Sequence, residues 1–512
     1  MATLKELRDS RIEKLNKIKE LGIDPYPAKS FRDTDNQSIQ NDFEKYENKD
    51  VIVAGRAMAI REHGKLAFID LKDQTGKIQL YIKKENLQNA DYKQSELNFD
   101  DLKLLDFGDF VEGHGKVTKT KRGEISVEVN KVRLLTKSLR PMPSAWDGLT
   151  DIETRYRQRY VDMTVNPEIR KVFEQRTIIV STIRNFLASK GFWEIETPIL
   201  QPIYGGASAR PFKTFHNSLG SDFYLRISNE LYLKRAIAGG FEKVFEFARD
   251  FRNEGIDRSH NPEFTMLEFY WAYADYDDLM TLTEEMITEV IMKIHGSTKF
   301  MHNGIEIDFT APYKRITFRD IILENTNVDI DTVTREEIIE EIKKRKLDSD
   351  LSKNPPLKDL LDEFYKETCR KNITQPIYLL DYPYEMIPLA KKKFENPSKI
   401  ASFQLVSMGM ELIKAYNELN DPIDQRDRMQ EEQKALDEGS SEEAHPIDYD
   451  FIRALEFGMP PTAGWGMGID RFVSFILDKP TLKDVIMFPT LRPENMLLEE
   501  SDIYPEIQKK TN

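Results

Sequence analysis

The chain has 512 residues, of which 40% are hydrophobic and 32% are charged, and its formal net charge is −14. This length allows two or three domains with a large buried core. The acidic balance argues against a protein coated for general nucleic-acid binding, although it leaves room for a local basic patch. No run of about eighteen apolar residues occurs, so we expect no membrane span.

Two features of the chain indicate a cytoplasmic location. The single cysteine, Cys369, excludes an internal disulfide and fits a reducing compartment. The N-terminus is charged every few residues and lacks the apolar core of a signal peptide. Apolar residues at roughly helical spacing predict an amphipathic helix in an N-terminal extension, residues 1–50: Leu4, Leu7, Ile12, Leu15 and Ile18.

Five short segments between residues 51 and 136 are rich in β-branched and aromatic residues. Turns that contain glycine separate them, and residues 73–76 have the composition of a hairpin turn. Five strands of this kind predict a small OB-type barrel, a fold that holds single-stranded nucleic acid in a positive groove. We therefore expect a surface for single-stranded nucleic acid on this domain.

Two residue sets carry that expectation. Between Lys116 and Arg140 the chain has eight basic residues and two acidic ones, which fits either a phosphate-contacting surface or a solvated strand face. Phe68 and Gln79 lie on adjacent predicted strands. They are candidates to stack on a base and to read its edge, although a strand phenylalanine is more often part of a core.

The pattern changes after a polar linker at residues 137–165, and residues 166–512 form the second predicted domain. It begins with a long amphipathic helix that ends at Gly191, followed by a strand that ends at Pro198. Strands and helices then mix without a regular repeat, which predicts an antiparallel α+β domain. Residues 332–373 are predicted to be a helical insertion, and an acidic helix is expected from Met429 onward.

Residues 249–270 concentrate arginines, carboxylates, a histidine and a phenylalanine around a glycine turn. This mixture suits a nucleotide triphosphate held beside a substrate that carries a carboxylate. A short Phe-Arg-x-Glu motif also occurs by chance, so the segment needs support from the rest of the chain.

That support comes from three segments that resemble, in order, the motifs of class II aminoacyl-tRNA synthetases. The long helix with the strand ending at Pro198 resembles the first motif, which builds a dimer interface. Residues 251–268 resemble the second motif, and residues 463–471 resemble the third, a glycine-rich strand that leads into a helix. The expected fold is α+β, with an N-terminal OB-fold β-barrel and a class II antiparallel-sheet catalytic domain.

An OB-type domain ahead of the catalytic domain is typical of the aspartyl, asparaginyl and lysyl enzymes. Four segments are similar to the lysyl-tRNA synthetase family: residues 205–212, 224–226, 230–235 and 415–422. The resemblance implies that lysine attacks the α-phosphate of ATP, and that the 3′ end of tRNA(Lys) then takes the lysyl group. It implies L-lysine, ATP and tRNA(Lys) as partners, and a homodimer.

The resemblance also implies roles for individual residues. Arg252 and Arg471 are the expected catalytic residues, because arginine is permanently charged and binds phosphate or carboxylate in a bidentate manner. The implied ATP-binding set is Arg252, Glu254, Arg258, His260, Asn261, Phe264, Glu411 and Arg471.

Recognition of lysine requires negative charge around two ammonium groups. By resemblance, Glu230 binds the α-amino group, Glu418 and the Tyr270 hydroxyl bind the ε-ammonium, and Glu268 supports them. The implied lysine-binding set is Gly206, Glu230, Arg252, Glu268, Tyr270, Lys414, Tyr416 and Glu418.

The chain departs from the family at two positions. Mg²⁺ is the expected cofactor, but the usual pair of metal-binding glutamates falls on Gln404 and Glu411, so the number of ions stays open. Lys414 stands where the family usually has asparagine, close to the substrate carboxylate. Strand alternation puts Glu411 out of parity with Lys414, so a bulge or twist is needed to bring both to one site.

The leading hypothesis is a ligase that charges tRNA(Lys). One alternative is a synthetase-like paralogue that lysylates a protein or acts on a lysine analogue. The other is a non-catalytic tRNA-binding protein, which the neutral Gln404 and the basic Lys414 keep open.

Overall fold

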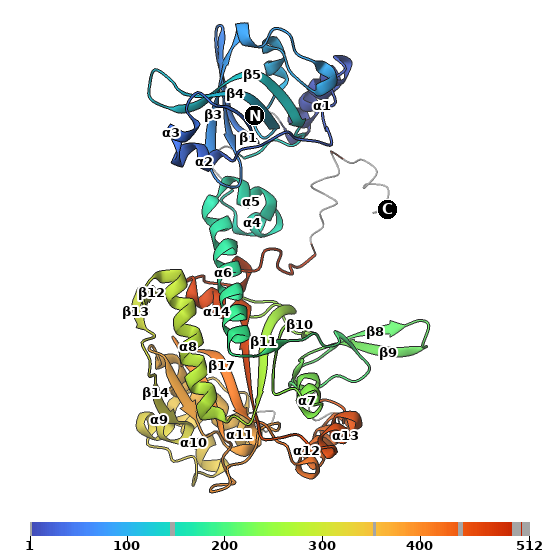
Figure 1. The fold of residues 1–512 in the computed structure, drawn as a ribbon. Helices are drawn as coiled ribbons and strands as arrows, with labels where there is room; N and C mark the ends of the chain where they lie inside the picture. Colours follow the sequence, from blue (N-terminus) through green and yellow to red (C-terminus); the bar gives the residue numbers. More distant parts are fainter. Residues whose placement is uncertain (1–2, 144–148, 352–354, 439–443, 494–502, 504–512) are drawn as a thin grey trace. The chain divides into compact units, whose positions relative to one another are not determined.

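The computed structural model describes residues 3–143, 149–351, 355–438, 444–493 and 503. The chain divides into two units (Figure 1). The first is built on residues up to 155 together with 160–165, and the second on residues 156–159 and 166–492. Each unit is described by itself.

A closed five-stranded barrel forms the first unit, with strand order β1-β2-β3-β5-β4. Its strands are β1 (Asp50–His63), β2 (Leu66–Lys72), β3 (Lys77–Lys83), β4 (Phe110–Lys119) and β5 (Ile125–Thr136). Alternate residues of β2 are buried, among them Ile69 and Leu71, as expected of strands that turn one face to a barrel core. The hairpin turn at Asp73 is present, and its side chain accepts hydrogen bonds from the backbone of Thr75 and Gly76.

Short helices accompany the barrel: α1 (Leu4–Glu20), α2 (Asn36–Asn41), α3 (Phe43–Tyr46) and the 3-10 turns Lys84–Asn86, Tyr92–Gln94 and Phe99–Leu104. The predicted N-terminal helix is thus present, and Thr3 caps it. Only its second half packs on the barrel, because Leu15 and Ile18 are buried whereas Leu4 and Leu7 are exposed. The predicted linker contains two further helices, α4 (Ile152–Arg157) and α5 (Arg159–Val165). Its residues 144–148 lie outside the described part.

An eight-stranded sheet organises the second unit, in the order β14-β15-β16-β17-β18-β11-β10-β6. Its strands are β6 (Trp193–Glu194), β10 (Lys243–Phe251), β11 (Glu263–Ala272), β14 (Lys314–Thr317), β15 (Ile377–Leu380), β16 (Ser402–Ser407), β17 (Met410–Asn417) and β18 (Thr462–Gly468). In this order, each strand from β15 to β10 pairs antiparallel with the next. The two pairs at the edges of the sheet, β14 with β15 and β10 with β6, are parallel. A closed barrel followed by an α+β domain on an antiparallel sheet confirms the predicted fold class.

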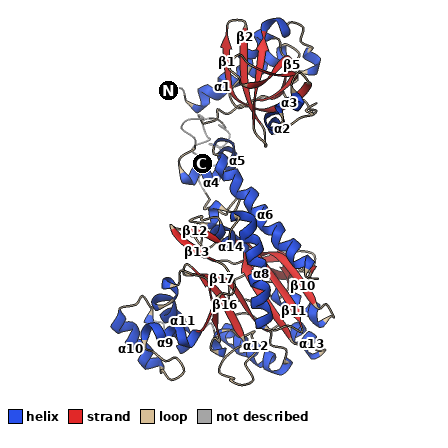
Figure 2. Ribbon diagram, turned by 60° about the vertical axis from the view of Figure 1, so that its left-hand side comes forward, coloured by secondary structure: helices blue, strands red, loops and turns tan. Residues whose placement is uncertain are grey.

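Helices cover one face of this sheet and bury the main core, as Figure 2 shows for α6 and α8. They are α6 (Pro167–Ser189), α8 (Tyr276–His295) and α14 (Ile469–Ile476). Ile183 of α6, Met286 of α8 and Phe472 of α14 are fully buried there. The strand predicted to end at Pro198 is shorter than expected. Pairing stops after β6, where the side chain and backbone of Thr197 bond to Glu246 instead of extending the ladder.

Three helices connect the parallel strands β14 and β15: α9 (Phe318–Thr326), α10 (Arg335–Arg345) and α11 (Leu357–Thr368). The last two, with the turn Arg370–Asn372, fall within the predicted insertion at 332–373, of which residues 352–354 lie outside the description. These helices share a separate apolar core with strands β14 to β16.

The remaining elements lie around the other face and the edges of the sheet. They are β7 (Leu200–Gln201), β8 (Phe212–His216), β9 (Ser221–Leu225), α7 (Glu230–Ala238), β12 (Lys299–His302), β13 (Ile305–Asp308), α12 (Pro422–Asp437), α13 (Tyr449–Glu456) and the turns Tyr384–Met386 and Leu482–Asp484. The acidic helix expected from Met429 therefore begins seven positions earlier, at Pro422, because Asp421 caps its first turn. The end of that prediction, residues 439–443, is not described.

Candidate active site

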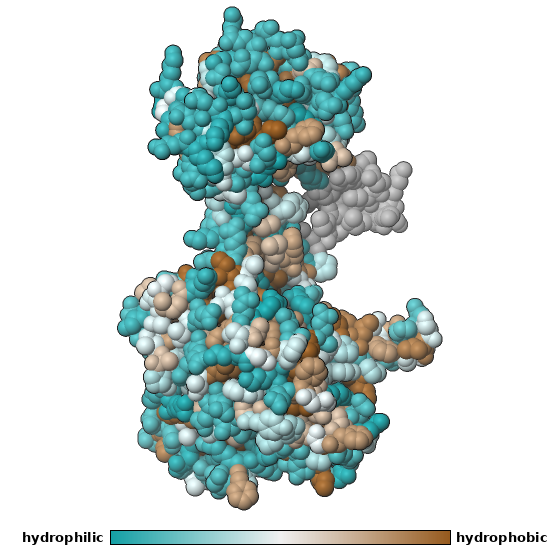
Figure 3. Space-filling model, in the orientation of Figure 1, coloured by the Kyte–Doolittle hydropathy of each residue, from teal (hydrophilic) through white to brown (hydrophobic). Residues whose placement is uncertain are grey.

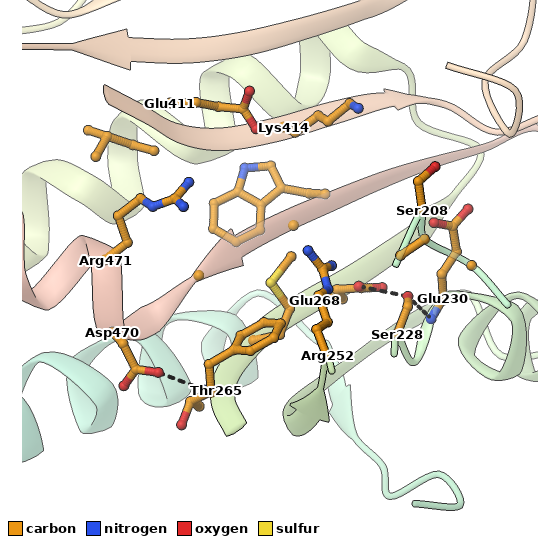
Figure 4. A pocket seen from close by; sticks show the side chains of 18 of the residues that line it. Ser208, Ser228, Glu230, Arg252, Thr265, Glu268, Glu411, Lys414, Asp470 and Arg471 are labelled. Atoms are coloured by element: carbon orange, nitrogen blue, oxygen red, sulfur yellow. Dashed lines mark hydrogen bonds between the residues drawn. The ribbon is translucent and has the colours of Figure 1, made fainter. Parts of the chain in front are cut away.

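A cavity of about 390 Å³ lies on the sheet face that α6 and α8 leave uncovered (Figure 4). Strands β11, β17 and β18 form its floor, and the starts of α7 and α14 contribute to its walls. It brings together most of the residues predicted from the sequence: Gly206, Glu230, Arg252, Glu254, His260, Asn261, Phe264, Glu268, Tyr270, Glu411, Lys414, Tyr416, Glu418 and Arg471.

The floor owes its shape to the alternation of side chains along β18. Ala463, Trp465 and Met467 point into the main core, whereas the glycines between them face the cavity. Gly464 pairs with Tyr270 on one side and Tyr416 on the other. A Cβ atom at Gly464 would stand 2.7 Å from the Tyr270 ring and would overlap the Glu418 carboxylate. The glycines therefore keep the centre of the floor open between two rows of functional side chains.

A buried lysine lies beside this floor, on α7. The Lys234 ammonium on α7 donates to the Glu230 carboxylate at 2.6 Å and forms an ion pair with Glu418. Lys234 and Glu418 have no exposed side-chain surface. Burial raises the pKa of Glu418 to about 8, although Lys234 acts in the opposite direction. Two of the predicted ammonium-binding carboxylates, Glu230 and Glu418, thus share a cation that the protein itself supplies.

Glu268 lies in the same pocket without such a cation. Its carboxylate accepts hydrogen bonds from the Tyr270 hydroxyl at 3.0 Å and from Ser228 at 3.3 Å. Among the described residues no cationic side chain pairs with it. Burial raises the pKa of Glu268 well above its usual value, and the nearby charge of Glu230 adds to the effect. A ligand ammonium would supply the missing positive charge.

Glu230 occupies the adjacent wall. Its second carboxylate oxygen accepts from the Tyr416 hydroxyl at 2.9 Å, and its backbone N–H donates to Ser228 at 3.1 Å. Gly206 has a φ of +88°, and a Cβ there would lie 3.0 Å from Ser228 and 3.3 Å from the Cβ of Glu230. The glycine therefore lets the backbone of the 205–208 loop approach the pocket closely.

Glu411 reaches the pocket through a β-bulge. The ladder pairs Leu405 with Ile413 but Val406 with Glu411, so Leu412 is an extra residue on β17. The bulge puts Glu411 and Lys414 on one face of the sheet although they are three positions apart. Strand alternation in the sequence had required such an irregularity. Within the described residues Lys414 forms no ion pair, and its ammonium is available to an anionic ligand.

Two arginines also line the pocket: Arg252, just after β10, and Arg471, in the first turn of α14. The Arg252 guanidinium lies 5.1 Å from the centre of the Phe264 ring. Asp470 accepts from the Thr265 backbone N–H at 2.8 Å and pairs with Arg176 at 2.6 Å. This network fixes the start of α14, from which Arg471 projects.

The loop between β10 and β11 carries the more exposed residues. Glu254 is exposed, and the His260 ring contacts Asp257 at 2.9 Å. Asn261 is buried, and its side-chain oxygen accepts from the Thr490 backbone N–H at 3.2 Å. Arg258 does not line the cavity; its side chain is exposed, and its carbonyl accepts from Leu482.

Gln404 is also absent from the cavity wall. It is buried on β16 directly opposite Lys414, and its side-chain oxygen accepts from the Tyr382 hydroxyl at 2.6 Å. Among the described residues no group of three or more histidine, cysteine, aspartate or glutamate side chains could hold a metal ion.

Phe68 on β2 and Gln79 on β3 alternate with core residues, so both side chains point away from the barrel core. The Phe68 ring stacks on Tyr81 with centroids 5.4 Å apart. Gln79 is buried, donates to Glu124 at 3.1 Å and accepts from Ser126 at 3.0 Å.

Part of the basic segment is structural. Arg133 is buried and pairs with Glu112 at 2.7 Å. Lys137 is buried and pairs with Asp109 at 2.8 Å. These two of the eight basic residues are thus held within the barrel and do not form a surface patch.

The sequence interpretation missed several residues of the site, namely Ser208, Ser228, Lys234, Thr265 and Asp470. The spacing of Lys234 from Glu230, four positions along a helix, could have indicated an ion pair. Such pairs usually lie on the surface, so the spacing does not indicate a buried one. The serines carry no signal of their own.

Comparison with known proteins agrees with both units. Residues 51–135 match the model of the OB-fold nucleic acid binding domain, and residues 151–492 match that of the class II tRNA synthetases of the D, K and N group. No described helix is long and apolar enough to cross a membrane.

Three curated relatives are named lysine–tRNA ligase. The protein of Thermoanaerobacter pseudethanolicus is 47% identical over 96% of this chain and 97% of its own length. Those of Clostridium acetobutylicum and Moorella thermoacetica are each 46% identical over 96% of this chain, covering 95% and 98% of their own lengths. The family match spans the whole described sheet domain, and the chain therefore belongs to the class II tRNA synthetases of the D, K and N group.

Proposed function

We propose that this protein is a lysine–tRNA ligase, which activates L-lysine with ATP and transfers it to the 3′ end of tRNA(Lys). The observation that carries the proposal is the charge pattern of the pocket floor. Glu268 is a buried carboxylate that pairs with no cation among the described residues, and it lies in one cavity with Arg252 and Lys414. An amino acid with a cationic side chain and a carboxylate complements this pattern, whereas an aspartate side chain would meet a carboxylate. Full-length relatives that are named lysine–tRNA ligase support the same substrate.

We assign the ε-ammonium of lysine to Glu268 and Tyr270, rather than chiefly to Glu418. Glu418 already shares Lys234 with Glu230, so its charge is partly compensated. Glu230 still presents a carboxylate to the α-amino group from the wall of the cavity. The α-carboxylate then faces Arg252 and Lys414.

For the first step, Arg252 would contact the α-phosphate as well as the lysine carboxylate, which is already ionised and needs no general base. Negative charge builds at the phosphate in the transition state, so fixed cations lower the barrier. Arg471 and His260 would hold the outer phosphates. Phe264 would stack on the adenine, with Glu254 near its amino group. Arg258 would reach ATP only after a change in its loop, because its side chain does not line the cavity.

Mg²⁺ fits this site as an ion held mainly by the phosphates of ATP. Glu411 is the carboxylate that would ligate it, and one carboxylate together with phosphate oxygens suffices for Mg²⁺. The bound ion would neutralise phosphate charge. Gln404 is placed less well as a ligand, since its oxygen already accepts from Tyr382 outside the cavity wall.

The barrel is the proposed anticodon-binding domain, with Phe68 as the stacking residue. Gln79 would exchange its bond to Glu124 for a bond to a base edge. We place the reaction in the cytoplasm, in keeping with the single buried thiol of Cys369.

A homodimer is proposed through the face formed by α6, β6 and the β7-β9-β8 sheet. Apolar side chains are exposed there, and Figure 3 shows them along the projecting β8–β9 hairpin. Trp193 is 67% exposed, Leu219 65% and Phe215 57%. Apolar exposure of this kind marks a protein interface. Sedimentation should give a dimer for the wild type and a monomer for Trp193→Glu with Phe215→Glu.

ATP–pyrophosphate exchange, measured with each amino acid in turn, tests the function. Lysine should support exchange and the other amino acids should not. Addition of tRNA(Lys) should then release AMP and give an RNA-linked lysyl ester, which separates this function from the lysylation of a protein. Absence of exchange with every amino acid would leave a non-catalytic tRNA-binding protein as the better account.

A further inference from the structure

A second cavity of about 120 Å³ adjoins the active site. The two cavities share the 206–208 loop, Lys414 and Tyr416 as walls. Ser208 and Lys414, both labelled in Figure 4, therefore face the site of adenylate formation on one side and this side chamber on the other. The chamber shares Gly206, Lys414 and Tyr416 with the lysine-binding set and extends beyond them to α12.

The chamber has a fixed wall of apolar residues. Residues 386–389 and Met429 of α12 form it, and Ile387, Leu389 and Met429 are buried. The Arg428 guanidinium holds this wall to α12, because it donates to the carbonyls of Pro388 at 2.9 Å and Ala390 at 3.0 Å. His445 closes a further side and packs over Gly205. An apolar wall of this kind suits the face of a flat ring.

Other polar side chains also line the chamber, among them Lys414, Glu432 and His445, but Gln425 has an unusual environment. It lies on α12 with no exposed surface, and it lines the chamber. Within the described residues neither its side-chain oxygen nor its side-chain nitrogen has a hydrogen-bond partner. Leaving both halves of a buried amide unpaired costs about 1–3 kcal/mol for each group. Such a cost is expected where a ligand completes the bonds.

The unpaired groups identify the kind of ligand. A glutamine amide offers one donor and one acceptor side by side, and adenine presents the complementary pair on its N6/N7 edge. Adenine is flat, and its face suits the apolar wall of residues 386–389 and Met429. The second step of the proposed function needs an adenosine within reach of the lysyl carbonyl, because tRNA ends in adenosine.

We propose that this chamber receives the terminal adenine of the tRNA 3′ end and that Gln425 reads its edge. The inference rests on the proposed function. The base would enter the slot while its ribose lies at the shared wall of Lys414 and Tyr416. A ribose hydroxyl oxygen then bonds to the lysyl carbonyl carbon, the bond from that carbon to the phosphate oxygen breaks, and AMP leaves with the electron pair and the hydroxyl proton.

Single-turnover transfer tests the proposal, with lysyl-adenylate formed on the enzyme before tRNA is added. Two tRNA(Lys) preparations are compared, one ending in adenosine and one ending in purine riboside, which lacks the 6-amino group. Wild-type enzyme should transfer to the purine-ended tRNA roughly 5- to 100-fold more slowly. Gln425→Leu should be slow with both and should differ between them by less than about two-fold.

Gln430→Leu is the matched control, since Gln430 lies on the same helix but is exposed. It should keep both the wild-type rate and the wild-type discrimination. Lysine-dependent pyrophosphate exchange should persist in Gln425→Leu, because that step does not use the chamber. Full discrimination by Gln425→Leu would overturn the proposal, and so would a loss of exchange equal to the loss of transfer. A wild-type enzyme without lysine-dependent exchange would overturn the proposed function itself.

Discussion

Glu268 and Lys414 face each other across Gly466, each on a strand that pairs with β18 at that glycine. Adjacent strands lie about 4.8 Å apart, so roughly 10 Å separates the two backbones. A carboxylate and an ammonium thus mark the two ends of an open strip of floor. Lysine, which carries the opposite charges at its own ends, would lie across this strip with its carboxylate toward Lys414.

The first prediction tests separately the Glu268 end and the Lys414 end of this strip. Glu268→Gln should weaken the binding of lysine and of lysinamide alike by about 10- to 100-fold, since a hydrogen bond to a charged group contributes about 1.5–3 kcal/mol. Lys414→Met should weaken lysine but leave lysinamide nearly unchanged, because lysinamide has no carboxylate. Calorimetry measures both constants, with Glu289→Gln on the exposed side of α8 as control. Equal losses for both ligands in Lys414→Met would contradict the orientation.

The second prediction follows from the raised pKa of Glu268. In the free protein the Glu268 carboxyl stays protonated to a higher pH than an ordinary glutamate does. A bound ammonium favours its ionised form. Lysine binding should therefore release protons at pH values above the usual glutamate range, which calorimetry in buffers of different ionisation enthalpy detects.

The same raised pKa affects stability. A carboxyl whose folded pKa lies above its unfolded value of about 4.3 loses its stabilising contribution as pH rises through the folded pKa. The melting temperature of Glu268→Gln should thus exceed that of the wild type by more at pH 8 than at pH 5. A gap that narrows as pH rises would show that the pKa is not raised.

The third prediction concerns Lys234. Lys234→Met should lower the free energy of unfolding by about 3–5 kcal/mol, because it leaves Glu230 and Glu418 buried without their cation. Adding Glu418→Gln should restore part of the loss. Denaturant unfolding monitored by circular dichroism gives both values, and losses that simply add would argue against the shared ion pair.

The fourth prediction separates the two candidate metal ligands. Glu411→Gln should raise the Mg²⁺ concentration at half-maximal exchange several-fold. Gln404→Glu should leave it unchanged, since Gln404 faces Tyr382 rather than the cavity. A lower Mg²⁺ requirement in Gln404→Glu would return residue 404 to the metal site.

The fifth prediction concerns the barrel. Phe68→Ala should reduce kcat/KM for charging tRNA(Lys) by about 10- to 100-fold, since stacking on one base contributes about 1–3 kcal/mol. Pyrophosphate exchange should be spared, because the substitution lies outside the sheet domain. Equal loss in both assays, or an unfolded barrel, would remove Phe68 from the anticodon surface.

The sequence predicted most of the cavity lining because its residues lie in contiguous motifs. Arg252, Phe264 and Glu268 come from one hairpin, so their spacing alone brings them near one another. It could not predict the compensation of Glu418 by Lys234, since that pair joins elements almost two hundred residues apart. Arg258 belongs to the same motif but projects from the loop to solvent, which no pattern of residue types reveals.

The alternation of side chains along a strand also could not predict which face a residue occupies where the strand is irregular. By alternation alone, the side chains of Glu411 and Lys414 would lie on opposite faces of the sheet. The bulge that brings them to one face arises only when β16 pairs with β17. Gln425 carried no signal at all, because an amide on an acidic helix is ordinarily solvated. Its burial depends on the 386–390 segment packing against α12.

The extra residue at Leu412 makes the length of this segment as important as its chemistry. Deleting it would leave both Glu411 and Lys414 in the chain yet turn the carboxylate to the opposite face of the sheet. An alignment that scores only residue identity would rate such a deletion as mild. Related chains should therefore tolerate exchanges of type at Leu412 far more readily than a gain or loss of one position between Glu411 and Lys414.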